Sequence, residues 1–180
     1  MDDARRELVA LSEYAFQRTR RRLEGLSDLE YLWEPVEGCW SARCRSDGRW
    51  TLDTAVAPLT PPFTTIAWRL WHLVGCYGQT KNARWLGLPL DTDGRFEMHA
   101  DVPATADAAL QCLDDAHDHW RALLDALSED ALGQPMGAIA GPFAQGRKAG
   151  YVLHMIDEFV HHGAELGVLR DLYRCSVGTP

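Results

Sequence analysis

The stretch of residues 151–173, YVLHMIDEFVHHGAELGVLRDLY, decides the expected fold. Apolar side chains recur along it at intervals of three and four residues. At about 100° per residue they fall on one broad face, the face that a core helix buries. The residues of this face are Val152, Met155, Ile156, Phe159, Leu166 and Leu169. The stretch therefore predicts a long amphipathic helix that packs against the rest of the chain.

Two acid–histidine pairs lie on this predicted helix, each with a spacing of four residues. Glu158 and His162 fall at the edge of the apolar face, whereas Asp157 and His161 point further outwards. A carboxylate and an imidazole one helical turn apart lie close enough to hold one metal ion. Such pairs are also common on solvated helix faces as weak charge pairs, so the spacing alone leaves both interpretations open. We prefer Glu158 and His162 as ligands because they turn nearer the core.

Three further stretches have the apolar periodicity of long helices. Pro61 and Pro62 open the second of them, because proline is tolerated in a first turn, and Gly87 ends it. The three stretches are residues 2–26, 61–86 and 104–127. With the helix of residues 151–173 they predict four helices that pack nearly antiparallel.

Long loops connect these predicted helices, over residues 34–62, 91–103 and 128–146. The first loop is the longest and includes an Asp47-Gly48 pair, which is typical of a hairpin tip. No convincing set of strands stands out. The sequence therefore predicts an all-α protein in which residues 1–180 form one domain, an up-down four-helix bundle with long connecting loops.

Two histidines on other predicted helices are candidates to complete a metal site. His72 stands in the middle of the second helix, in the aromatic-rich segment Trp68-Arg69-Leu70-Trp71-His72-Leu73. His117 lies on the apolar seam of the third helix. A lone histidine among apolar residues is more often a packed core residue than a ligand, so both interpretations stay open for each side chain.

Composition and charge exclude several function classes. The formal net charge of −8 removes the broad basic surface on which non-specific nucleic-acid binding depends. No apolar run reaches the roughly 18–20 residues that span a bilayer, and residues 1–10 lack the apolar core of a signal peptide. The five cysteines are scattered without a Cys-x-x-Cys pair, so we interpret them as free, mostly buried thiols in a reducing compartment. We expect a cytoplasmic protein that binds neither nucleic acid nor membrane.

Two short elements carry a resemblance to a known family. They are Trp68-Arg69-Leu70-Trp71-His72-Leu73 and residues 157–166, DEFVHHGAEL. Together with the helix order and loop placement along nearly the whole chain, they make it resemble the DinB/YfiT-like family of four-helix bundle metalloproteins. That family includes bacillithiol transferases and the metal-binding domain of mycothiol-dependent maleylpyruvate isomerase.

The resemblance implies a set of metal ligands. In the family, one histidine of the second helix and two residues four apart on the fourth helix bind a divalent metal, and the commonest pair on the fourth helix is two histidines. The mycothiol-linked branch is similar to this sequence, with glutamate first and histidine second. The resemblance therefore implies His72, Glu158 and His162 as ligands, and the alternative register implies Asp157 and His161 for the helix-four pair.

The resemblance also implies chemistry. Two histidines and one carboxylate leave coordination positions for water or substrate, and this ligand set suits Zn²⁺ or Ni²⁺, with Fe²⁺ as a further choice. We expect transfer of a low-molecular-weight thiol, or thiol-assisted isomerisation or detoxification, on a small-molecule substrate. His154, His161 and His117 are candidates for residues that orient the ligands. A homodimer is compatible with the resemblance.

Two other functions remain open on the sequence alone, and it does not decide whether the protein is an enzyme. The first is a non-catalytic bundle that binds a small ligand or a partner around a structural or vestigial metal site. The second is a metal-dependent hydrolase, which would need a second positioned base. Only His117 offers itself for that role.

Overall fold

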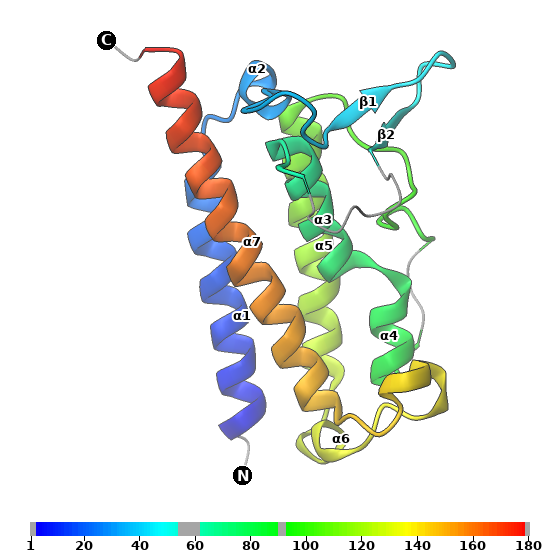
Figure 1. The fold of residues 1–180 in the computed structure, drawn as a ribbon. Coiled ribbons are helices and arrows are strands. Elements are labelled where there is room, and N and C mark those ends of the chain that lie inside the picture. Colours follow the sequence, from blue (N-terminus) through cyan, green and yellow to red (C-terminus); the bar gives the residue numbers. More distant parts are fainter. Residues whose placement is uncertain (1–2, 54–61, 90–92, 179–180) are drawn as a thin grey trace.

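The computed structural model describes residues 3–53, 62–89 and 93–178, and most of these residues are helical (Figure 1). Residue 2, where the first helix was expected to start, and Pro61 lie outside the described residues. The long helices are α1 (Asp3–Arg22), α3 (Ile66–Gly78), α5 (Ala106–Ala126) and α7 (Lys148–Ser176). The shorter ones are α2 (Asp28–Tyr31), α4 (Thr80–Leu86), α6 (Glu129–Gly133) and the 3₁₀ helix η1 (Ala138–Phe143). The predicted all-α class is confirmed, with the addition of one small hairpin.

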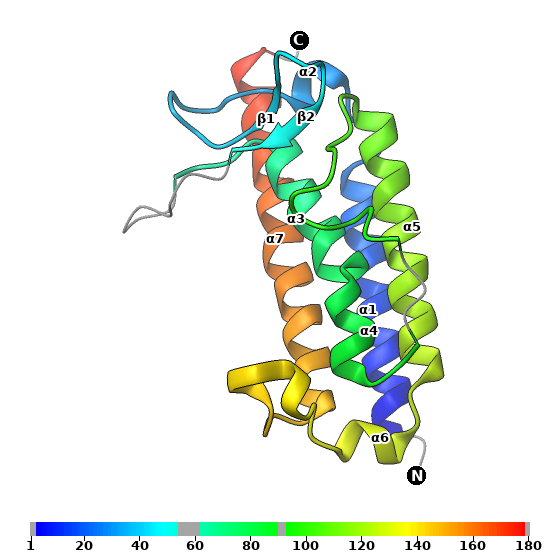
Figure 2. The same ribbon diagram turned by 90° about the vertical axis from the view of Figure 1, so that its right-hand side faces the viewer.

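The four long helices lie side by side, and their directions differ from strict alternation. Both α1 and α3 contact α5 and α7. Figures 1 and 2 show that α1 and α7 run in one direction while α3 and α5 run in the other. The expectation that each helix runs opposite to the one before it is therefore wrong for α3 and α5. The reason is the connection after α4, because α4 ends at one end of the molecule and α5 begins at the other.

The second predicted helix is two helices with a break between them. Its extension across residue 79 is wrong, because Gln79 has the extended backbone of φ −61° and ψ 141°. The ring of Phe96 packs so closely on Gly78 that a Cβ there would lie 2.5 Å from it. The side-chain amide of Asn82 donates to the carbonyl oxygens of Cys76 and Tyr77, both at 2.9 Å, and so satisfies the end of α3. The helix also begins later than predicted, at Ile66.

The predicted hairpin tip is confirmed. Strands β1 (Ala42–Cys44) and β2 (Trp50–Leu52) pair antiparallel on either side of Asp47-Gly48. Gly48 has φ +84°, a conformation that glycine adopts without strain. The hairpin lies near the N-terminal end of α3 and leaves the long helices free to pack along their length (Figure 1).

Helix α7 approaches α1 closely through two small residues. A Cβ on Gly163 would lie 2.3 Å from the Oγ1 atom of Thr19, and one on Gly167 would lie 3.3 Å from the Nε atom of Arg22. These two glycines therefore admit the neighbouring helix. Near the same end, Arg170 and Glu30 form a buried ion pair with an Nε–Oε1 distance of 2.8 Å. None of the described helices is both long and apolar enough to cross a membrane.

The close approach at Gly163 predicts a difference between two matched substitutions. Gly163→Ala should lower the free energy of unfolding by about 1–3 kcal/mol, because the new methyl group meets the buried Thr19. In Gly167→Ala the new methyl group meets only the flexible Arg22 side chain, and alanine favours a helix over glycine by about 1 kcal/mol. The free energy of unfolding of this variant should therefore equal or exceed that of the parent. Urea unfolding of both variants measures this. Equal stability of the two would contradict the packing described for α1 and α7.

Candidate metal centre

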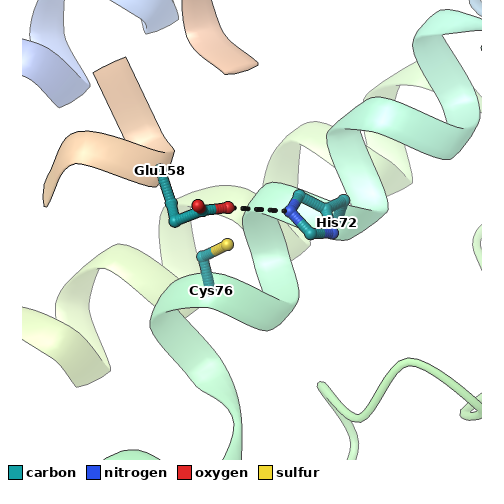
Figure 3. Close-up of side chains that lie close together, drawn as sticks. All are labelled: His72, Cys76 and Glu158. Carbon is teal, nitrogen blue, oxygen red and sulfur yellow. Dashed lines mark hydrogen bonds and ion pairs between the residues drawn. The ribbon is translucent and has the colours of Figure 1, made fainter. Parts of the chain in front are cut away.

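The antiparallel contact between α3 and α7 brings three of the predicted ligands together. The Nε2 atom of His72 lies 3.5 Å from the Oε2 atom of Glu158, and the Nε2 atom of His162 lies 3.3 Å from the same oxygen. The two imidazole rings meet edge to face, with centroids 4.6 Å apart and planes at 88°. Figure 3 shows the His72 ring directed at the Glu158 carboxylate across the two helices.

These separations fit donor atoms that share one metal ion. Zinc binds nitrogen and oxygen ligands at about 2.0–2.2 Å in a tetrahedron, so neighbouring donor atoms lie about 3.3–3.6 Å apart. The two nitrogen–oxygen distances in the structure, 3.5 Å and 3.3 Å, fall in that range. The His72–Glu158 and His162–Glu158 separations therefore each fit a pair of donor atoms on one divalent metal.

Protonation in the folded protein also suits metal ligation. Burial, together with the nearby His162 and Arg69, lowers the pKa of His72 to about 4, so its imidazole is neutral at pH 7. Burial works against the charge on Glu158, but the hydrogen bond with His72 and the neighbouring imidazoles outweigh it and lower the pKa of its carboxyl. A neutral imidazole and an ionised carboxylate are the forms that bind divalent metals.

Glu165 orients His162, and sequence reasoning missed it. Its Oε2 atom lies 2.7 Å from the Nδ1 atom of His162, and the Nε atom of Arg69 lies 2.7 Å from the same oxygen as an ion pair. When the Nδ1–H group donates to Glu165, the lone pair of Nε2 faces Glu158. Lone pairs that face each other at such a distance repel unless a proton or a cation lies between them. A carboxylate three residues after His162 was the signal in the sequence.

Cys76 is the second residue that sequence reasoning missed. It stands one turn after His72 on α3, and its Sγ atom points toward the Glu158 carboxylate (Figure 3). Ligand atoms of His72, Cys76 and Glu158 all lie within 4.8 Å of one another. Cys76 is buried, as expected for a packing residue. Burial and the nearby Glu158 raise the pKa of its thiol to about 12. The spacing of four residues from His72 to Cys76 was the overlooked signal.

The alternative ligand pair lies on the outer side of α7. Asp157 and His161 are both exposed, and the His161 side chain is 65% accessible. His161 lies 3.4 Å from the Oε1 atom of Glu165, so it touches the carboxylate that orients His162. Among the described contacts, neither Asp157 nor His161 reaches His72. Glu158 and His162 are thus the pair that contacts His72 among the described residues.

The other two histidines lie in different places. His154 is exposed one turn before Glu158 and lines a cavity beside the centre. His117 does not face the centre, and of the two interpretations left open for it the structure has the packed histidine. It is buried against α1, where it stacks on Phe16 with centroids 3.6 Å apart and lies 3.2 Å from a carboxylate oxygen of Glu13. Helix α5 packs on α1 as well as on α3, and the His117 side chain lies on the part of its apolar face that contacts α1.

A cavity of about 290 Å³ opens beside His72 and Glu158. Its walls also include Cys76, Lys81, Met98 and Met155. The Trp68 ring stacks on the His72 imidazole with centroids 5.6 Å apart and planes at 11°. His72 is therefore supported by the Trp68 ring and also borders a cavity large enough for a small molecule.

Comparison with known families agrees with this geometry. A family model described as the DinB superfamily matches residues 12–166. The chain belongs to the DinB superfamily. The match includes every residue of the candidate centre on α3 and α7, and it confirms the resemblance inferred from the sequence. No curated protein matches the chain.

The lowered pKa of His72 predicts how the metal-free protein responds to acid. Between pH 6.5 and about 4 the unfolded chain binds a proton at His72 that the folded protein does not, so stability falls as the pH falls through this window. The loss is at most about 3 kcal/mol, from 1.4 kcal/mol per pH unit. Urea unfolding of metal-free His72→Gln should show a smaller loss, whereas His99→Gln, at an exposed position, should behave like the parent. Equal losses in the parent and His72→Gln would contradict the burial of this imidazole.

The position of Glu165 predicts an effect on metal affinity. Glu165→Gln should weaken Zn²⁺ binding by about 10–100-fold, the usual cost of losing a partner that orients a histidine ligand. Asp157→Asn, an exposed change of the same kind on the same helix, is the matched control and should leave affinity unchanged. Competition with a chromogenic chelator measures both. An unchanged affinity in Glu165→Gln would show that His162 does not depend on this contact.

Proposed function

We propose that the protein is a divalent-metal-dependent enzyme that activates a low-molecular-weight thiol, of the mycothiol or bacillithiol type, for transfer or for thiol-assisted isomerisation or detoxification. The observation that carries the proposal is the convergence of the His72 and His162 Nε2 atoms on one oxygen of Glu158. Membership of the DinB superfamily supports it. The same proposal takes the four long helices as the four-helix bundle of that family.

In this proposal His72, Glu158 and His162 hold the metal. The donor set of two imidazoles and one carboxylate suits Zn²⁺ or Ni²⁺, with Fe²⁺ as a further choice. When bound, such an ion lowers the pKa of a thiol or polarises a carbonyl group, which is the chemistry that thiol transfer needs. Three protein ligands leave room for a substrate, which distinguishes a working site from a closed structural one.

The surrounding residues keep the donors in place. Glu165 fixes which nitrogen of His162 carries the proton, and Arg69 balances the charge of that carboxylate. Trp68 restricts the His72 ring by stacking. Rigid support of this kind matters because a metal-binding constellation must be held within about 0.5 Å of its productive geometry.

The cavity at the centre suits a small-molecule substrate. This cavity, of about 290 Å³, adjoins a larger groove of about 590 Å³. Lys81, His154 and Met155 line both. The thiol end of a substrate would enter beside Glu158, and the remainder would extend along α7. The net charge of −8 disfavours nucleic acid as the partner instead.

The proposal predicts that metal and turnover depend on the same residues. His72→Ala and His162→Ala should each lose bound metal and thiol-dependent turnover, whereas His99→Ala, at an exposed position, should keep both. Elemental analysis of the purified variants measures the metal. A panel of electrophiles with and without added thiol measures the turnover.

The outcomes separate the competing functions. Product that forms without added thiol would favour a metal-dependent hydrolase. Metal that stabilises the fold while no electrophile yields a thiol adduct would favour a binding module with a structural ion. Full metal content in His162→Ala would contradict the ligand assignment itself.

A further inference from the structure

The centre is built from two pairs of potential donors, one on each helix. His72 and Cys76 are four residues apart on α3, and Glu158 and His162 are four residues apart on α7. Side chains four residues apart on a helix lie on the same face one above the other. Because α3 and α7 run in opposite directions, the second residue of one pair faces the first residue of the other (Figure 1).

The contacts follow this arrangement. His72 meets His162 ring to ring at 4.6 Å, and both contact Glu158. At the other end Cys76 lies beside Glu158, with ligand atoms of His72, Cys76 and Glu158 all within 4.8 Å of one another. The side chain of Cys76 is buried, and it borders the same cavity as His72 and Glu158. Cys76 therefore packs in the core and also places its sulfur beside His72 and Glu158.

We propose that Cys76 is a fourth protein donor to the metal, as a thiolate, beside His72, Glu158 and His162. The inference rests on the metal site in the proposed function and goes beyond the three ligands that the resemblance implies. One thiolate, one carboxylate and two neutral imidazoles around a divalent ion leave no net charge, which reduces the cost of placing the ion in a partly buried site. A thiolate donor also favours Zn²⁺ over harder ions.

The fourth donor has a consequence for thiol chemistry. With Cys76 among the donors, a low-molecular-weight thiol would reach the ion by replacing this thiolate. The incoming thiol would give up its proton and the released Cys76 would take up one, so the net charge of the centre would stay the same.

Cobalt substitution tests the inference through a spectroscopic signature. Co²⁺ bound to the full-length protein gives visible ligand-field bands from any low-symmetry site, and a thiolate ligand adds an intense near-ultraviolet charge-transfer band. The test variant is Cys76→Ser. The matched control is Cys112→Ser on α5, which removes a partly buried thiol outside the centre. A phosphine reductant keeps the cysteines reduced without supplying a competing thiol.

The parent and Cys112→Ser should show both sets of bands, and Cys76→Ser should keep the visible bands but lose the near-ultraviolet one. Zn²⁺ affinity of Cys76→Ser should fall by at least the 10–100-fold that loss of a supporting residue costs. Circular dichroism checks that the serine variant is folded, and Cys76→Ala replaces it if it is not. A near-ultraviolet band that persists without Cys76, or is absent from the parent, overturns the inference while the metal site stands. Absence of all bands from the parent overturns the metal site as well.

Discussion

All of the proposed donors stand on α3 or α7, so the antiparallel packing of these two helices decides whether a metal centre can form. Aromatic contacts hold the helices together next to the donors. Tyr77 stacks on Phe159 with centroids 4.3 Å apart, one residue beyond Cys76 on α3 and Glu158 on α7. Eight residues before Phe159 on α7, the hydroxyl of Tyr151 donates to the side-chain oxygen of Asn82 at 2.6 Å. A shift of either helix would break these contacts together with the site.

The interruption between α3 and α4 belongs to the same arrangement. Helix α3 ends just after Cys76, and the Asn82 side chain that accepts from Tyr151 also donates to the last carbonyl groups of α3. Asn82 therefore couples the end of α3 to α7. The break costs little, because the carbonyl groups that it frees are satisfied within the fold.

The sequence was sufficient for the features that depend on local pattern. Helical periodicity predicted the long helices. The position of Glu158 and His162 at the edge of an apolar face predicted that their side chains turn toward the core. The sequence was insufficient for features that depend on contacts between residues far apart in the chain. The break at Gln79 depends on Phe96, which packs on Gly78, and the parallel course of α3 and α5 depends on how the intervening loop crosses the molecule. Cys76 was interpreted as a packing residue because its proximity to Glu158 is a tertiary contact between α3 and α7, which the local sequence does not reveal.

The most direct test of the account is the position of the metal itself. A crystal of the full-length protein grown with Zn²⁺, measured on both sides of the zinc absorption edge, gives an anomalous difference peak wherever zinc is bound. The account predicts one strong peak between α3 and α7, about 2.0–2.2 Å from the Nε2 atoms of His72 and His162 and from a carboxylate oxygen of Glu158. A strong peak elsewhere, or none between these helices, would contradict it.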